Sequence, residues 1–127
     1  MMKFEIVGQP ITKKNSQQII KCGGRYMVIP SKQYRAYEEM ALKQLPKVFY
    51  NCPINIKCVY YMPTRRRVDL TNLLEATDDV LVKGGVIADD NCTIVVGHDG
   101  SCVKYSKDNP RVEITIEEKE WTVWDEE

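Results

Sequence analysis

The chain has 127 residues, a length that fits one domain with a single hydrophobic core. Hydrophobic residues make up 43% and charged residues 28% of it, as in ordinary soluble proteins, and no apolar run approaches the roughly 20 residues that a membrane helix needs. The 18 basic and 18 acidic residues cancel, but residues 117–127 hold six acids and one base, so the rest of the chain carries +5. A basic body with an acidic tail is compatible with nucleic-acid binding without requiring it. The N-terminus lacks a signal-peptide pattern, so a cytoplasmic protein is expected.

The N-terminal part of the chain predicts two short strands. Residues 3–7 alternate between apolar and polar side chains, which is typical of a strand. Residues 8–16 include Pro10 and a polar run, so a loop is expected there. A second strand is expected over residues 25–29, after a turn at Gly23-Gly24.

A helix and a long strand follow. The helix is expected to begin after Ser31, whose side chain can cap it, and to end near Leu45, just before Pro46. Residues 54–62 alternate and predict a strand that Pro63 ends. Four helix residues are expected along one face, namely Tyr34, Tyr37, Ala41 and Leu45. In the strand, one side is expected to hold Ile54, Ile56, Cys58 and Tyr60, and the other Asn55, Lys57, Val59 and Tyr61.

A second helix is expected over residues 70–82, with Asp69 as its N-cap and Gly84 or Gly85 at its left-handed end. Its apolar residues recur with helical spacing, so one face should be buried. The buried face is expected to hold Leu70, Leu73, Leu74, Thr77, Val80 and Leu81, and the opposite face Asn72, Glu75, Ala76 and Asp79. Further strands are expected over residues 93–96, 102–105 and 112–116. The pattern predicts an α+β fold with a mixed or antiparallel sheet of about four to five strands and two main helices.

The composition disfavours some kinds of site. The five cysteines are odd in number and include no Cys-x-x-Cys pair, so reduced thiols are expected rather than a disulfide framework or a zinc site. His98 is the only histidine, so a Ser-His-Asp triad would have to use it.

The segment from Arg65 to Asn91 carries most of the functional signal. Three arginines lead into Asp69 at a helix start, and Asp89-Asp90 follow the helix. Basic groups that can hold phosphate, beside carboxylates that can hold a divalent cation, are the parts needed for metal-assisted phosphodiester cleavage. Each residue also has an ordinary structural explanation as a helix cap, a turn or a solvated surface. For the acids to meet, the chain has to return along the helix, for example in a strand that begins near Val86.

The string from Met62 to Leu73, followed by Asp79 and Asp89-Asp90, resembles the signature of the RusA-type Holliday junction resolvases. The polar segment at residues 10–16 is similar to the family's N-terminal segment. The resemblance implies a nuclease domain over residues 1–117 and leaves residues 118–127 as an acidic tail. It also implies a homodimer that binds four-way DNA junctions and nicks two strands in a Mg²⁺-dependent reaction, with no role for a membrane. Small resolvases of this kind often travel in prophages.

The resemblance assigns roles by position. Asp69 and Asp90 match the family's metal-binding aspartates, and Asp89 and Asp79 match its other recurrent acids. The expected phosphate contacts are Lys13, Lys14, Arg65, Arg66 and Arg67.

Two positions depart from the family pattern. Thr71 stands where the family usually has a second aspartate, and Glu75 stands where it often has a lysine. Glu75 lies close enough in sequence to replace the lost acid as a metal ligand, which is a hypothesis. The alternatives are a non-catalytic dimer that binds junctions or branched DNA and has lost a ligand at Thr71, or an unrelated domain whose acids are only caps and turns.

Overall fold

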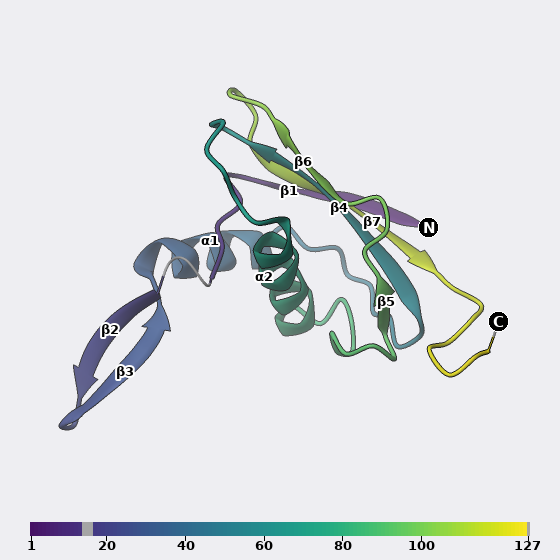
Figure 1. Ribbon diagram of the computed structural model, residues 1–127, viewed down its shortest axis with the longest axis horizontal. Helices are drawn as coiled ribbons and strands as arrows, with labels where there is room; N and C mark the ends of the chain where they lie inside the picture. Colours follow the sequence, from purple (N-terminus) through teal and green to yellow (C-terminus); the bar gives the residue numbers. More distant parts are fainter. Residues whose placement is uncertain (14–16, 127) are drawn as a thin grey trace.

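A five-stranded mixed sheet and two helices form the body of the protein (Figure 1). The computed structural model describes residues 1–13 and 17–126. The sheet contains β1 (Met2–Val7), β4 (Ile54–Met62), β5 (Val95–Gly97), β6 (Cys102–Tyr105) and β7 (Arg111–Glu118), the helices are α1 (Lys32–Leu42) and α2 (Leu70–Lys83), and β2 (Gln17–Cys22) and β3 (Arg25–Pro30) form a separate hairpin. The predicted α+β class, with a mixed sheet and two main helices, is confirmed.

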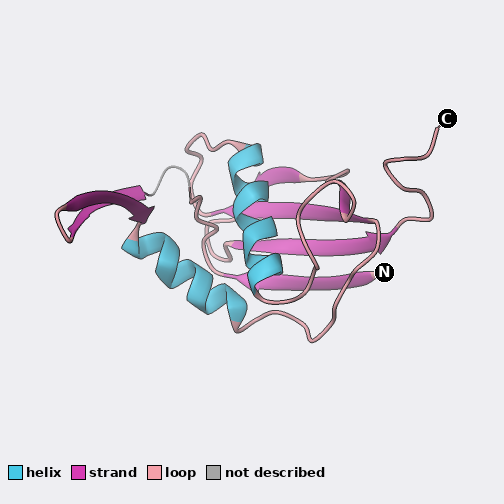
Figure 2. Cartoon of the chain, turned by 90° about the horizontal axis from the view of Figure 1, so that it is seen from below, coloured by secondary structure: helices cyan, strands magenta, loops and turns pink. Residues whose placement is uncertain are grey.

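Strand β4 lies in the middle of the sheet. Strand β7 pairs antiparallel with both β1 and β4, whereas β5 and β6 run parallel to β4 along its two halves. Alternation along the strands sends one set of side chains to the face that α2 crosses (Figure 2). The fully buried residues on that face include Ile54, Ile56, Cys58 and Tyr60 of β4 and Val112, Ile114 and Ile116 of β7. The prediction that the four β4 residues share one side of the strand is therefore confirmed, and that side is the buried one.

Helix α2 packs a wider face into the core than its apolar stripe predicts. Leu73, Val80 and Leu81 are at most 1% exposed, as expected from their spacing. Ala76 was expected on the opposite face, but it is 3% exposed, so that prediction is wrong. The reason is that α2 contacts α1 as well as the sheet, so two sides of the helix are covered.

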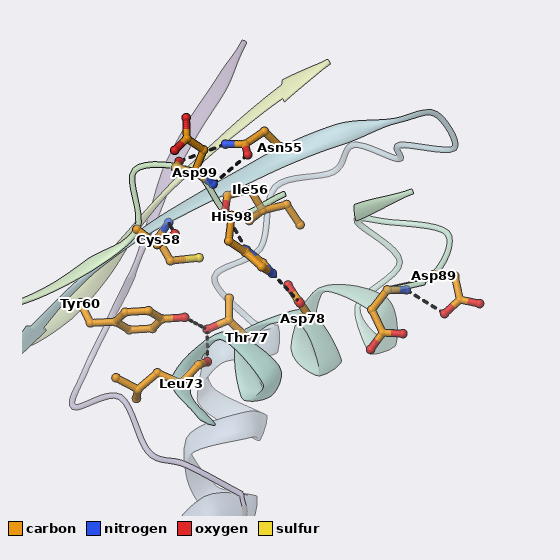
Figure 3. Close-up of polar contacts among 12 residues, drawn as sticks. Asn55, Ile56, Cys58, Tyr60, Leu73, Thr77, Asp78, Asp89, His98 and Asp99 are labelled. Carbon is orange, nitrogen blue, oxygen red and sulfur yellow. Dashed lines mark hydrogen bonds and ion pairs between the residues drawn. The ribbon is translucent and has the colours of Figure 1, made fainter. Parts of the chain in front are cut away.

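A buried hydroxyl network fixes the rotation of α2 against β4. The Thr77 hydroxyl donates to the Leu73 carbonyl at 3.0 Å, so it accepts from the Tyr60 hydroxyl, which lies 2.7 Å away (Figure 3). Both side chains are buried, and buried hydroxyls require such partners. This contact determines which residues of α2 point away from the sheet.

The element boundaries differ from the prediction at two places, the end of α1 and the segment after α2, where the left-handed glycine itself is as predicted. Helix α1 is capped by the Ser31 hydroxyl, as expected, but it ends at Leu42. The Gln44 side chain makes two hydrogen bonds to the Val7 backbone, at 2.8 and 2.9 Å, and these draw the chain away from the helix axis. After α2, Gly85 takes the left-handed conformation with φ of +74°. The expected strand near Val86 is reduced to a single bridge between Tyr50 and Ile87.

Two further differences concern short strands. Strand β2 was not predicted, because its run of residues lacks strong alternation. Strand β5 begins at Val95 rather than at Thr93, since the Thr93 backbone and hydroxyl both bond to the Asn91 side chain in a turn. Within the described residues, neither helix has the length and apolar character required to cross a bilayer.

Candidate functional site

Asp69 occupies the position just before α2, but its carboxylate does not cap the helix. The backbone has extended torsions (φ −84°, ψ 120°), and its carbonyl accepts from the Asn72 and Leu73 amides. The carboxylate is exposed, and its hydrogen bond within the described chain comes from the Asn72 side-chain amide at 3.3 Å. The N-cap position is as predicted, whereas the carboxylate points to solvent and is available to a ligand.

The arginine loop directly precedes this carboxylate. Arg65, Arg66 and Arg67 are all exposed between the end of β4 and the start of α2. The Arg65 guanidinium lies over the Tyr105 ring, 4.6 Å from its centroid. Tyr105 is held there because β6 runs parallel to the end of β4. The loop therefore presents three positive charges beside Asp69, one of them fixed by stacking on an aromatic ring.

A second group of carboxylates lies near the C-terminal half of α2. Burial, the Asp89 carboxylate and the charge of Asp79 together raise the pKa of Asp90. Asp89 accepts from the Asp90 amide at 2.7 Å and from the Asn91 side chain at 3.0 Å, and these bonds lower its pKa (Figure 3). The Asp89 carboxylate thus accepts hydrogen bonds from the next two residues of its own turn, whereas the pKa of Asp90 responds to the charge of Asp79. Like charges held together in this way favour a bound cation.

Lys13 brings a positive charge to this second group. Its ammonium lies 3.6 Å from Asp79, and both side chains are partly exposed. The pair connects the loop after β1 to α2, which the sequence pattern did not predict. Exposed pairs of this kind contribute little stability, so Lys13 remains free to exchange Asp79 for another anion. Lys14, the other lysine expected to contact phosphate, falls outside the described residues.

The two groups of predicted site residues lie toward opposite ends of α2. Asp69 and Asp79 are ten residues apart, which is about 15 Å along a helix. The groups that most strongly shift the pKa of Asp90 are its own burial, Asp89 and Asp79, and Asp69 is not among them. The charge of Asp79 therefore acts on Asp90, which follows Asp89 in the turn, whereas Asp69 adjoins the arginine loop in sequence. The described part of the chain contains no group of three or more His, Cys, Asp or Glu side chains arranged to hold a metal ion.

The donor chemistry of the second group nevertheless fits Mg²⁺. This ion prefers carboxylate oxygens, retains several waters, and often takes only one or two protein carboxylates. Asp79 and Asp90 are two such ligands, and the charge of Asp79 contributes, after burial and Asp89, to the raised pKa of Asp90. Glu75 is exposed on α2 one turn before Asp79, so it lies between the two groups.

His98 and Asp78 form a buried polar pair that sequence reasoning missed. His98 Nε2 lies 2.9 Å from the Asp78 carboxylate, and His98 Nδ1 lies 2.8 Å from the Ile56 carbonyl (Figure 3). A carbonyl only accepts, so Nδ1 carries a proton, and the contact with Asp78 needs a second one. His98 thus links α2, through Asp78, to β4, through the Ile56 carbonyl. The available signal was that the only histidine and an aspartate next to Asp79 both lacked an assigned role.

Both members of this pair hold their protons more tightly than usual. Burial lowers the pKa of His98, but the hydrogen bond and charge of Asp78, with the Ile56 carbonyl, outweigh it and raise the pKa. Burial raises the pKa of Asp78, although His98 opposes the change. One carboxylate oxygen of Asp78 is buried without a hydrogen-bond partner among the described residues, which adds to the cost of its charged form.

This pair predicts a pH-dependent stability. Because the folded pKa of His98 is raised above 6.5, its stabilising effect is complete below pH 6.5 and is lost as the pH rises through the folded pKa. We expect the urea midpoint of the wild type to fall over that range, and the midpoint of His98→Gln to fall less. Parallel curves for the two proteins would show that His98 does not titrate differently on folding.

Comparison with known proteins agrees with the geometry. A search of the curated proteins found no match. The model of the family described as endodeoxyribonuclease RusA matches residues 7–117, which include the Lys13 loop, the arginine loop, α2 and both groups of carboxylates. The match covers most of the chain and confirms the resemblance seen in the sequence. RusA-family nucleases generally depend on divalent metals. The chain belongs to the RusA family of endodeoxyribonucleases.

Proposed function

We propose that this protein is a Mg²⁺-dependent endonuclease that resolves four-way DNA junctions by paired nicks. Membership of the RusA family implies an endodeoxyribonuclease with Holliday junction resolvase activity. The observation that carries the finer proposal is the group of Asp79, Asp90 and Lys13. The charge of Asp79 contributes to the raised pKa of Asp90, and the Lys13 ammonium lies 3.6 Å from Asp79. This part of the molecule therefore offers carboxylates that can bind a cation and a lysine that can bind a phosphate.

Each residue has a defined task in this proposal. Arg65, Arg66 and Arg67 bind the phosphates that flank the crossover, since guanidinium groups match phosphate geometry and stay charged. Asp69, Asp79 and Asp90 are the carboxylates that would hold the cation. When bound, Mg²⁺ polarises the scissile phosphate and lowers the pKa of a water molecule. Lys13, which pairs with Asp79, is the basic residue that would bind a phosphate of the DNA backbone.

A homodimer accounts for the separation of Asp69 from the other acids. Asp69 lies about 15 Å along α2 from Asp79 within one protomer. If α2 of two protomers lies antiparallel about a two-fold axis, Asp69 of one protomer lies near Asp79 and Asp90 of the other. Such a dimer has two equivalent composite sites, and its symmetry matches that of a four-way junction. Two equivalent sites are what paired nicking requires.

Glu75 is proposed to replace the acid that the family has at position 71. Thr71 and Glu75 are both exposed and lie four residues apart, so they share one face of α2. We expect Glu75→Gln to raise the Mg²⁺ concentration needed for half-maximal cleavage by roughly tenfold, because one anionic charge is lost near the cation. Glu39→Gln, at an exposed position on α1, is the matched control. An unchanged Mg²⁺ requirement and rate would remove Glu75 from the site.

The runner-up is a junction-binding dimer without cleavage activity. Its support is Thr71, which is neutral and a weaker ligand than the aspartate usual in the family. The two functions separate in one experiment, in which junction binding is measured in EDTA against linear-duplex competitor before Mg²⁺ is added. Selective binding followed by cleavage supports the nuclease. Selective binding without cleavage supports the runner-up, and the absence of selective binding overturns both.

A further inference from the structure

The β2–β3 hairpin projects from the body as an arm. Both views show it extending beyond α1, away from the sheet and from α2 (Figures 1 and 2). Its extensive contacts are those between its own two strands. A two-stranded hairpin that packs on nothing else is only marginally stable in water. A binding partner that packs against the hairpin would stabilise it.

The arm is positively charged. Residues 10–37 contain six lysines and arginines and no acid. Lys21 and Arg25 lie next to the hairpin turn, and both are exposed. Neither forms an ion pair with any residue in the part of the chain that the structure describes. The charges are therefore available to a polyanion.

One face of the arm is also apolar. Ile19 pairs with Val28, and Lys21 pairs with Tyr26, so these side chains project to the same face. Ile19, Val28 and Tyr26 are 70%, 61% and 76% exposed. A contiguous exposed group of large apolar side chains is uncommon on a soluble protein and marks an interaction site.

We propose that this face binds the branched DNA substrate, with Tyr26 stacked on a base at the crossover and Lys21 on a neighbouring phosphate. The inference rests on the proposed function and adds a second contact surface to it. Charge complementarity selects DNA over a second copy of the chain, since lysines are depleted at protein interfaces and an acid-free arm matches a polyanion. Bases at a branch point expose faces on which an aromatic ring can stack. A two-stranded ribbon also fits the major groove of the adjoining duplex.

The arm lies within reach of DNA held at the carboxylates. Lys13 pairs with Asp79, and β2 begins four residues later at Gln17. Four residues span at most about 14 Å. The base of the arm therefore starts close to the proposed cation site, and we expect the duplex arms of a bound junction to extend past it.

The test compares arm variants with matched controls in junction binding measured in EDTA at several salt concentrations. Tyr26→Ala is expected to weaken binding by roughly 5- to 100-fold, and Tyr26→Phe to retain the wild-type affinity. Met27→Ala is the control, because Met27 is an exposed neighbour on the opposite face of the arm. Lys21→Ala is expected to reduce the slope of log affinity against log salt by about 1. Lys3→Ala removes one exposed charge from the body and should leave the slope unchanged.

The oligomeric state of every variant is measured alongside by light scattering. Weakened binding by Tyr26→Ala with an unchanged oligomeric state supports the inference. Unchanged affinity and slope in the arm variants overturn it, while wild-type junction binding leaves the proposed function standing. Weakened binding that accompanies dissociation of the protein also overturns it, because the face is then an interface between protomers. A wild type that shows no junction binding refutes the proposed function itself.

Discussion

Asp90→Asn is expected to reduce junction cleavage by about 1000-fold while leaving junction affinity in EDTA unchanged. Burial, the Asp89 carboxylate and the charge of Asp79 raise the pKa of Asp90. Removing the charge of Asp90 removes an anionic ligand from the proposed cation site. Loss of roughly 4 kcal/mol of transition-state stabilisation corresponds to this change in rate. Single-turnover cleavage of a labelled four-way junction measures it.

The matched control is Asp108→Asn. Asp108 is an exposed aspartate in the turn between β6 and β7, outside both groups of carboxylates. The Asp108→Asn protein should cleave at the wild-type rate. If Asp90→Asn also cleaved within about threefold of the wild type, Asp90 would revert to a turn residue, and the cation site would need other ligands.

A mixture of Asp69→Asn and Asp90→Asn proteins is expected to regain nicking activity that neither has alone. In a composite site, Asp69 comes from one protomer and Asp90 from the other. A mixed dimer then has one site with both substitutions and one site with neither. After free exchange, half of the dimers are mixed, so about one quarter of the sites are intact.

The recovered activity has a distinctive product. Each mixed dimer cuts only one strand, so the mixture should give single nicks where the wild type gives paired ones. Strand-specific end labels distinguish the two products on a denaturing gel. If each protomer instead holds a complete site of its own, every site in the mixed dimer carries one of the two substitutions, and no activity returns.

Local patterns in the sequence predicted most of the fold. Strand β4 was bounded correctly because its alternation is regular and Pro63 ends it. Helix α2 was found from its apolar spacing, with Asp69 and the two glycines at its ends. The hairpin strand β2 was missed because nothing packs on it to impose a strong alternation of apolar and polar residues.

Long-range contacts limited the prediction of the site. The segment from Arg65 to Asp90 lies within the family match, and its role as the site stays a prediction. The ion pair between Lys13 and Asp79 joins residues that are far apart in the chain, and no local pattern signals it. The burial of Asp78 against His98 likewise depends on how α2 rotates over β4, which the buried hydroxyls of Tyr60 and Thr77 determine.

The most direct test is cleavage by the wild-type protein of a four-way junction and of a linear duplex of the same sequence, each with Mg²⁺ and with EDTA. We expect paired nicks in two strands of the junction in Mg²⁺, no cleavage in EDTA, and no cleavage of the duplex. Equal cleavage of the duplex, or nicks that persist in EDTA, would contradict the account of a metal-dependent junction resolvase.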